Sequence, residues 1–432
     1  MCAPESAVYP LVVGLVQAVA QLRHLGTAGA VSHLVWAVLA SQSVRTADVA
    51  RALGNERAAG ARQAMRRVRR ALGRASLSSV TLTPGLIAAA LRLVPSGSVT
   101  LVLDSTRCWR WEVFTIGVLF AGRVLPVAWS VLPDPWPKGQ FTPTVVALLN
   151  RVFVAWPRER AVHLVADRGF PSLALFGCLA RWARTLEMGD TIRLRAGDWV
   201  RAAGLGAARV RELLTDTAPD VWRTWRASSL KAGAASPPAL LVVGRATPAF
   251  PAHQCGPADQ ARREQRAARR RAHVLSKGQP GALATDTVWA LLSTHADAAA
   301  ARAADERRFA TEPTYRDLKG WGLEAALAHE TSAAHVNGRL GLAALADFVQ
   351  AAVGAAAGRT SDRLARARQQ QWSTTDRLSV FWRGRQVLHD RAHDWSPWLS
   401  ATLKELDRRL SLLPLPASPP RPPHLAPQQA AA

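Results

Sequence analysis

SVTLVLDST, residues 98–106, is the stretch that decides the fold of this chain. Its unbroken run of β-branched and aliphatic residues ends in Asp104, which is typical of a buried strand. Two more strands are predicted after it, WEVFTIGVLFAG (111–122) and VLPVAWSVLP (124–133), joined as a hairpin at Gly122-Arg123. The sequence therefore predicts a sheet that begins with three consecutive strands.

The next predicted elements alternate between helix and strand. They are a helix over 144–156, the strand AVHLVADRGF (161–170), a helix over 172–187 and the strand TIRLRA (191–196). Three strands, helix, strand, helix and strand is the order of an RNase H-like core, in which the first strand lies beside and parallel to the fourth. We therefore expect an α/β fold, with a mixed sheet and flanking helices.

Two acidic residues end two of these strands. If the strands are parallel neighbours, about 4.8 Å apart, Asp104 and Asp167 point into the same space. Two ionised carboxylates so close repel each other and raise each other's pKa unless a cation lies between them. A single Asp at a strand end is usually a turn former, but the pair in this strand order indicates a cation site.

A third acid is predicted in DERRFATEPTYRDLKGWGLE, residues 305–324. In an unbroken helix Arg308, Glu312 and Lys319 fall at roughly 0°, 40° and 20°, on one face. A carboxylate between two long cations suits a metal ligand that lies against a polyphosphate backbone. The alternative is a solvated face with i,i+4 charge pairs. Pro313 follows the Glu directly, so the helix is kinked there or begins nearby.

The Arg-x3-Glu-x6-Lys spacing and the following Gly-Trp-Gly-Leu-Glu resemble the signature of insertion-sequence transposases of family four, DDE enzymes with a Tyr-Arg-Glu-Lys motif. LVLDST and then ADRGF resemble the earlier acidic blocks of that family, and the resemblance covers about residues 98–350. The family has Tyr three residues before the Arg, where this chain has Asp305, so this position has no predicted role.

The resemblance implies a catalytic triad of Asp104, Asp167 and Glu312. Three carboxylates can hold two Mg²⁺ or Mn²⁺ ions per active site, about 3.5–4 Å apart, and Mg²⁺ prefers oxygen ligands. We expect Asp104 to bridge the ions, with Asp167 and Glu312 each closing one side. One ion would activate a water or a DNA 3′-OH, and the other would stabilise the departing 3′ oxygen.

Basic residues around the triad are the expected DNA contacts. The family motif implies that Arg308 and Lys319 contact the backbone near the scissile phosphate. Arg168 belongs to the ADRGF block, in which Gly169 suits a sharp turn close to metal or DNA. Arg316 is a further contact by proximity alone.

Residues 1–96 are predicted to form a helical DNA-binding domain. RTADVARALGNERAAGARQAMRRVRRALGR (45–74) suggests a helix-turn-helix, with Ala50 and Gly54 spaced as at a tight helix crossing. The second helix is strongly basic, and Arg66, Arg67 and Arg70 are its predicted DNA contacts. A plain two-helix hairpin with a basic exposed face is the alternative.

Residues 198–285 are predicted to be a basic insertion in the core. It holds a strand-like segment, ALLVVGRA (239–246), and the basic run ARREQRAARRRAHVLSKG (261–278). At helical phase Arg262, Arg266 and Arg269 or Arg270 form one stripe, which indicates phosphate contacts, although a charged linker has the same composition. Arg270 is taken as the third contact. In the family an insertion at this place clamps the transposon end, and an aromatic side chain can stack on a flipped base. Trp199, Trp222 and Trp225 are candidates by position only, with plain packing as the alternative.

The remaining boundaries follow from composition. We expect the RNase H-like core to consist of two segments, 97–197 before the insertion and 286–358 after it. A C-terminal helical region at 359–412 and a disordered Pro/Ala-rich tail at 413–432 are expected to follow. The later core segment begins with the strand DTVWALLST (286–294) and continues into the Glu312 helix.

The composition indicates which class of partner the protein binds and in which cellular compartment it works. The 432 residues hold 55 Lys and Arg against 31 Asp and Glu, a net charge of +24 with pI ≈ 11.5. Nucleic acid is the usual partner of such a surface, with an anionic membrane surface as the alternative. Four dispersed cysteines argue against a zinc site and a disulfide framework and fit a reducing cytosol. The apolar run 8–20 is read as a buried helix and not as a membrane span, so we expect no membrane partner and a cytoplasmic, nucleoid-associated bacterial protein.

These observations predict a metal-dependent DNA transposase that cleaves insertion-sequence ends and joins them to new DNA. The resemblance implies its partners, which are double-stranded DNA, as inverted-repeat transposon ends and target, and a second copy in a homodimeric synaptic complex. Hairpin formation is implied by the resemblance alone. Two alternatives stay open: an RNase H-like nuclease without strand transfer, and a non-catalytic DNA-binding copy of a decayed transposase.

Overall fold

The structure is a computed structural model that describes residues 8–20, 25–53, 58–94, 97–214, 221–230, 239–245, 288–369, 384–385 and 388. The chain divides into two compact units. The first consists of Met1–Gly97, Ser105–Pro157 and Ala310–Ala432, and the second of Ser98–Asp104 and Arg158–Phe309. Each unit is described by itself below.

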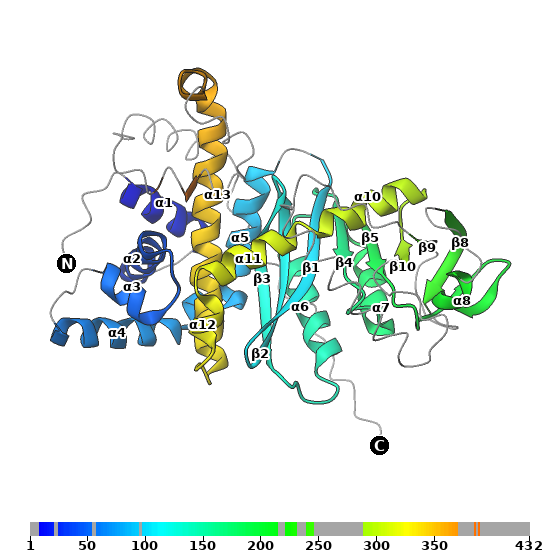
Figure 1. Cartoon of the computed structure of the whole chain (residues 1–432), viewed down its shortest axis with the longest axis horizontal. Helices are drawn as coiled ribbons and strands as arrows, with labels where there is room; N and C mark the ends of the chain where they lie inside the picture. The colour runs from blue at the N-terminus through cyan, green and yellow to red at the C-terminus, as the bar shows by residue number, and fades with distance from the viewer. Residues whose placement is uncertain are drawn as a thin grey trace, which may run out of the picture. The chain divides into compact units, whose positions relative to one another are not determined.

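The first unit is mainly helical. Its helices are α1 (Val8–Ala20), α2 (Leu25–Ser41), α3 (Thr46–Ala52), α4 (Ala58–Leu72), the 3-10 turn η1 (Ala75–Leu77), α5 (Ser79–Leu93), α6 (Phe141–Ala155), α11 (Thr311–Gly320), α12 (Leu323–Leu327) and α13 (Ala333–Gln369). The long helix α13, orange in Figure 1, packs against α1, α2, α4, α5 and β3. The helical character predicted before Pro95 is confirmed within the described residues, whereas a separate N-terminal domain stays a prediction.

A hairpin of β2 (Trp111–Phe120) and β3 (Arg123–Pro133) provides the strands of the first unit together with the end of β1. Ala121 and Gly122 have φ of 48° and 76°. A two-residue turn with positive φ at both positions matches the twist of the flanking strands. The predicted hairpin is therefore confirmed, but its turn is Ala121-Gly122 and not Gly122-Arg123.

Strand β1 (Val99–Cys108) contributes to both units, because Asp104 is the last residue that it gives to the second. In the second unit the strand order is β1-β4-β5-β10-β9-β8-β6-β7. The bounds are β4 (Val162–Ala166), β5 (Met188–Arg193), β6 (Trp199–Ala202), β7 (Gly206–Arg209), β8 (Trp222–Leu230), β9 (Ala239–Arg245) and β10 (Val288–Ser293). Strand β4 pairs in parallel with both β1 and β5, and β10 is antiparallel to β5. The predicted mixed sheet and the parallel first and fourth strands are confirmed.

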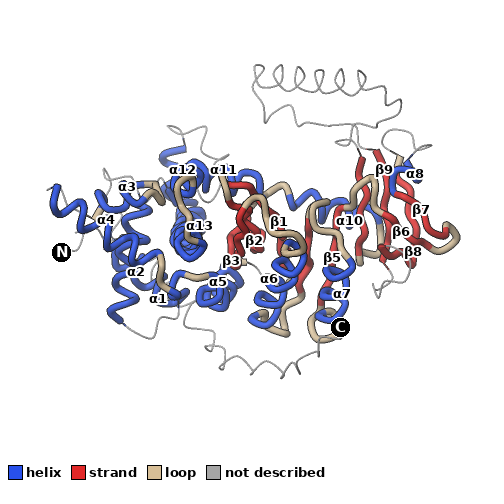
Figure 2. The backbone as a smooth tube through the Cα atoms, turned by 90° about the horizontal axis from the view of Figure 1, so that it is seen from below, coloured by secondary structure: helices blue, strands red, loops and turns tan. Residues whose placement is uncertain are grey.

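The insertion has more strand structure than the sequence predicted. Strands β6 to β9 continue the sheet of the second unit beyond β10, with the short helix α8 (Val210–Leu214) beside them (Figure 2). The basic run 261–278, with Arg262, Arg266 and Arg270, lies outside the described residues, and so do Gly54-Asn55 and nearly all of the C-terminal region and tail.

Helix α7 (Leu173–Trp182) is shorter than the predicted helix 172–187. Ser172 caps its beginning, because the hydroxyl accepts a hydrogen bond from Leu175 N at 3.1 Å. The other end is set by the sheet. The carbonyl of Glu187 already accepts a hydrogen bond from Val162 N at 2.9 Å, so the chain must leave the helix before that residue.

The prediction that one unbroken helix carries Arg308, Glu312 and Lys319 is wrong. Helix α10 (Ala298–Arg308) ends at the first of these residues, and α11 begins at Thr311. Pro313 lies in the first turn of α11, where a missing backbone N–H costs no helical hydrogen bond. The common face therefore holds for Glu312 and Lys319 only.

Among the described residues one stretch, Ala75–Leu93, is long and apolar enough to cross a membrane, and half of it is buried inside the protein. Core helices of globular proteins have the same length and composition.

Candidate active site

Asp104 and Asp167 lie at matching positions of neighbouring parallel strands in the second unit. Leu103 of β1 is registered with Ala166 of β4, and each Asp is the next residue along its chain. The side chains of Asp104 and Asp167 are 16% and 31% exposed. The geometry inferred from the strand order is therefore present, and solvent reaches both carboxylates.

Arg308, from the last turn of α10, lies between the two carboxylates. Its Nη1 is 4.0 Å from Oδ2 of Asp104, and its Nη2 is 3.5 Å from Oδ1 of Asp167. The side chain is 8% exposed. Because each ion pair uses a different nitrogen, one guanidinium holds both Asp104 and Asp167. The predicted contact of Arg308 with the DNA backbone stays a prediction.

Asp305 is the third acid of this cluster, and the sequence reasoning assigned it no role. Its Oδ1 lies 3.7 Å from Nε of Arg308, too far for a hydrogen bond but close enough for an ion pair. The side chain is 0% exposed. Burial raises the pKa of Asp305, and the charges of Arg308 and Arg193 oppose this shift.

A signal for Asp305 was present in the sequence. The buried residues of α10 are Ala301, Ala304, Asp305 and Arg308, at the i, i+3, i+4, i+7 spacing of one helix face. An acid and a base on an otherwise small-residue buried stripe indicate an internal ion pair.

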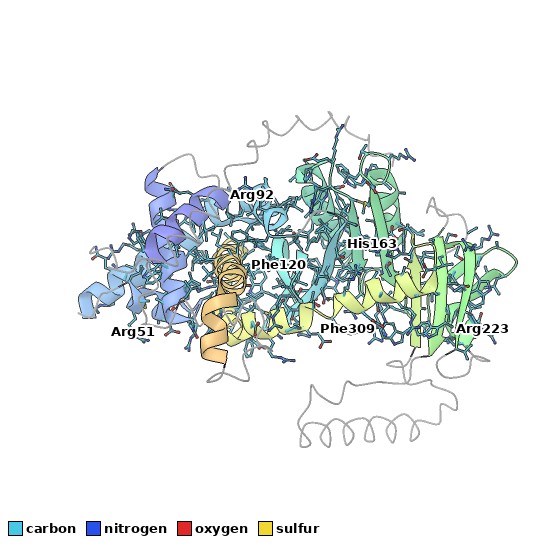
Figure 3. All side chains as sticks on the ribbon, turned by 90° about the horizontal axis from the view of Figure 1, so that it is seen from above. Arg51, Arg92, Phe120, His163, Arg223 and Phe309 are labelled. Carbon is cyan, nitrogen blue, oxygen red and sulfur yellow. The ribbon has the colours of Figure 1, made fainter. Side chains whose placement is uncertain are left out.

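A second cation and two aromatic rings line the same region. Arg193, buried in β5, lies with its guanidinium carbon 4.5 Å from the centroid of the Trp289 ring. Phe309, labelled in Figure 3 at the end of α10, is exposed, and Arg308 lies 4.6 Å from its ring centroid. The sequence reasoning missed Arg193 and Trp289, because neither belongs to a motif.

The side chain of Arg195 holds the turn after β4 through two backbone carbonyls. Arg195 donates from Nε to the Arg168 carbonyl at 2.7 Å and from Nη2 to the Gly169 carbonyl at 3.1 Å. The Arg168 side chain is exposed, as a DNA contact requires. A Cβ at Gly169 would meet nothing within 4 Å, so the fold itself does not require glycine here.

Glu312 belongs to the first unit, near the start of α11. Three contacts fix the inner side of this helix to the β2–β3 hairpin: Thr314 Oγ1 accepts from Val124 N (3.0 Å), Tyr315 OH contacts Thr115 Oγ1 (2.5 Å) and Asp317 pairs with Arg123 (3.3 Å).

The outer side of α11 carries the predicted motif residues. Glu312 and Arg316 are exposed and Lys319 is half-buried. Their i, i+4, i+7 spacing places them on one face. Arg316, predicted by proximity alone, therefore shares the face of Glu312 and Lys319.

The donor atoms of the carboxylate pair fit a hard divalent cation, since Asp104 and Asp167 offer partly exposed oxygens on neighbouring strands. The prediction that Asp104 ends its strand is wrong, because β1 continues past it to Cys108, whereas β4 ends just before Asp167. Within the described ranges, however, no three His, Cys, Asp or Glu side chains lie together as a metal site. The two-ion site with Glu312 thus stays a prediction.

Helix α4 presents the predicted basic face. Ala64, Val68 and Leu72 are buried on its inner side. The arginines of this segment are all exposed: Arg62, Arg66, Arg67, Arg69, Arg70 and Arg74. The short helix and the basic second helix are confirmed as elements, and their DNA contact is a prediction.

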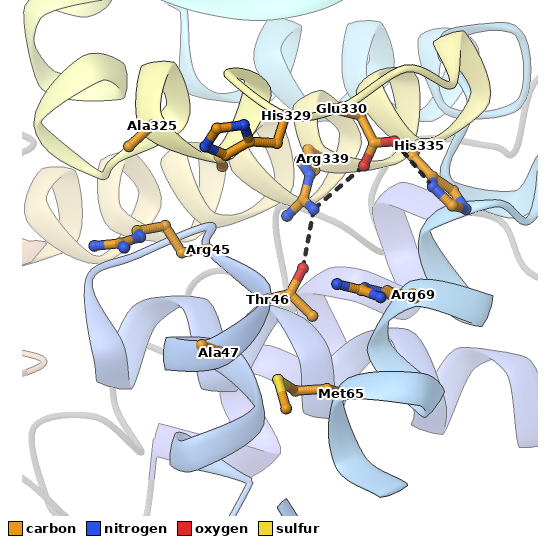
Figure 4. Close-up of a pocket in the computed structure, with 11 residues that line it drawn as sticks. Arg45, Thr46, Ala47, Met65, Arg69, Ala325, His329, Glu330, His335 and Arg339 are labelled. Carbon is orange, nitrogen blue, oxygen red and sulfur yellow. Dashed lines mark hydrogen bonds and ion pairs between the residues drawn. The ribbon is translucent and has the colours of Figure 1, made fainter. Parts of the chain in front are cut away.

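A polar groove of about 510 Å³ lies in the first unit beside α3 and α4 (Figure 4). Its charged lining residues are Arg45, Arg69, His329, Glu330, His335 and Arg339. Glu330 pairs with Arg339 at 3.4 Å and with His335 at 3.3 Å. Because Glu330, His335 and Arg339 pair with one another, we assign these three residues to stability.

Two of the three candidate tryptophans of the insertion, Trp199 and Trp222, lie against an arginine. Trp199 is exposed, with Arg209 5.0 Å from its ring centroid. Trp222 and Trp225 are half-buried, and Arg302 lies 3.9 Å from the Trp222 centroid. Trp222 also meets Trp289 edge-on at 6.3 Å.

No protein-family model matches the sequence, and no curated protein is significantly similar to it. Among solved structures the chain is similar to a piggyBac transposase in a synaptic complex with hairpin DNA. The TM-score is 0.38 at 10% sequence identity, over 96% of this chain and 84% of that one. At these values the likeness is too distant to assign a function.

Proposed function

We propose that this chain is a metal-dependent DNA transposase, which cleaves insertion-sequence ends and transfers the resulting strands to target DNA. The observation that supports it best is the Asp104–Asp167 pair at matching positions of parallel strands β1 and β4. The blocks LVLDST and ADRGF, the downstream Glu312 motif and the net charge of +24 support the same function.

Asp104 and Asp167, with Glu312 as the third acid, would hold Mg²⁺ or Mn²⁺ at this site. When bound, such ions supply an activated oxygen nucleophile and stabilise the departing 3′ oxygen. Arg168, Arg316 and Lys319 would hold the DNA backbone beside the site, and the exposed arginines of α4 would bind the transposon end. The complete complex would be a homodimer on paired inverted repeats in the bacterial nucleoid.

The test is cleavage of DNA that carries the gene's own flanking ends, with Mg²⁺, by wild type and Glu312→Gln. Nicks or breaks at the end boundaries that are absent from the variant support a triad and a transposase together. Persistent cleavage by the variant contradicts the choice of third acid. Cleavage without joining to a target plasmid favours an RNase H-like nuclease.

A non-catalytic DNA-binding copy is the second candidate. Asp305 at the position of the family Tyr, and Pro313 directly after Glu312, favour it. Specific end binding by a protein that never cleaves would identify this function.

A further inference from the structure

The Asp104–Asp167 pair already has a cation between its carboxylates. Arg308 approaches them with Nη1 and Nη2, at 4.0 Å and 3.5 Å. The guanidinium is shielded from bulk solvent. In such a shielded place charges attract each other more strongly than at an exposed surface. A metal ion that binds the same oxygens, Oδ2 of Asp104 and Oδ1 of Asp167, therefore competes with these two nitrogens.

Asp305 holds the guanidinium from a third side, through Nε. Neither oxygen of this fully buried carboxylate has a hydrogen-bond partner among the described residues. Asp305 and Arg308 lie one turn apart on α10, so the helix itself keeps them together. With Nε held in this way, Nη1 and Nη2 are the atoms that face Asp104 and Asp167.

We propose that Arg308, positioned by Asp305, is an internal counter-cation of the Asp104–Asp167 pair and competes with a divalent metal ion for these carboxylates. The inference rests on the proposed function, because it takes the pair as belonging to a metal site. Arg308 holds the metal-free carboxylates together and lowers the affinity of the site for the ion. Asp305 is a positioning residue, which acts through Arg308.

The test is the affinity of the full-length protein for Mn²⁺ alone, measured from the electron paramagnetic resonance signal of free Mn²⁺. Arg308→Met removes the competing charge with a side chain of similar length, and we expect it to tighten Mn²⁺ binding about tenfold or more. Arg307→Met is the matched control, because Arg307 is exposed on the same helix. Equal affinities of Arg308→Met and wild type overturn the proposal, as does an equal gain in the control.

Arg308→Met leaves buried Asp305 without its counter-ion, which can prevent folding. The double variant Asp305→Asn/Arg308→Met removes both charges of the buried pair, and we expect the same gain in Mn²⁺ affinity from it. Asp305→Asn alone keeps Arg308 but removes the carboxylate that positions it. The Mn²⁺ affinity of this variant should therefore lie between those of wild type and the double variant. A lower melting temperature with unchanged Mn²⁺ affinity would overturn the positioning role.

Asp104→Asn separates failure of this inference from failure of the proposed function. If wild type and the Arg308 variants bind Mn²⁺ equally and Asp104→Asn abolishes binding, the metal site stands and the competition is refuted. If no folded variant binds Mn²⁺, the metal site fails and the competition fails with it.

Discussion

Asp104 and Asp167 come directly after Leu103 of β1 and Ala166 of β4, which are paired in the parallel register of these strands. Two residues far apart in the sequence therefore reach the same level of one sheet. Parallel pairing makes this possible, because β1 and β4 run in the same direction from a matched register. Arg308 then holds the two carboxylates, which would otherwise repel each other.

Asp104→Asn should abolish metal-dependent DNA cleavage, with a loss of about 100-fold or more, because an amide is a poor ligand for Mg²⁺. The measurement is the rate of nicking of end-bearing plasmid DNA in Mg²⁺. Glu159→Gln is the control, since Glu159 is exposed in a turn of the same unit. Equal rates for both variants would exclude Asp104 from the chemistry.

Glu312→Gln should stop cleavage while end binding stays within a few-fold of wild type. Binding energy is expected to come from the basic surfaces, and removal of one exposed carboxylate changes them little. Fluorescence anisotropy of labelled end DNA measures the binding. A variant that loses binding together with cleavage would contradict this division of labour.

The sequence predicted the core strands well because each is a continuous apolar or β-branched run with turn signals at its ends. The Asp pair was predictable for the same reason, since strand order alone places Asp104 beside Asp167. Strands β6 to β8 were missed, because WVRA, GAAR and WRTWRASSL carry little apolar alternation. Antiparallel pairing of β6 with β7 and of β8 with β9, and not the apolar pattern of each strand, decides the structure here.

The sequence also failed to predict that α10 ends at Arg308. The helical spacing predicted that one helix runs from Arg308 to Glu312. Phe309 and Ala310 lie between them, and neither residue is a helix breaker. The break follows from tertiary contacts: α10 packs on β4, β5, β9 and β10, whereas Thr314, Tyr315 and Asp317 fix α11 to the hairpin. Such contacts leave no local signal in the sequence.

Asp190→Asn should remove a pH dependence of stability. Burial raises the pKa of Asp190 to about 7. The folded state thus favours the protonated form, and this stabilisation is full below the unfolded pKa near 3.9 and is lost as pH rises to about 7. The loss amounts to roughly 4 kcal/mol over that window.

Urea unfolding of wild type and Asp190→Asn between pH 4 and 8 measures this loss as a difference of unfolding free energies. Glu187→Gln, an exposed acid beside β5, is the control and should follow wild type. A constant difference between wild type and Asp190→Asn across the range would contradict the assignment.

Arg339→Met should lower the free energy of unfolding by about 2–4 kcal/mol. The buried guanidinium donates to the Val44 carbonyl (2.8 Å) and to Thr46 Oγ1 (2.9 Å) and pairs with Glu330. Its loss leaves buried acceptors unpaired. Arg51→Met, which removes an exposed ion pair with Asp48, should cost less than about 0.5 kcal/mol. Equal costs in denaturant unfolding would refute the role of burial.

Arg66→Gln/Arg70→Gln should weaken end binding and lower the magnitude of the salt slope of log K by about 2, one counter-ion for each lost phosphate contact. Both arginines are exposed on α4 and lie one turn apart, so stability should not change. Arg158→Gln/Arg184→Gln removes the same charge from exposed sites in the other unit. Titrations at several salt concentrations compare the two pairs. Equal slopes would mean that α4 contributes only to the general field of the protein and would favour the plain basic hairpin.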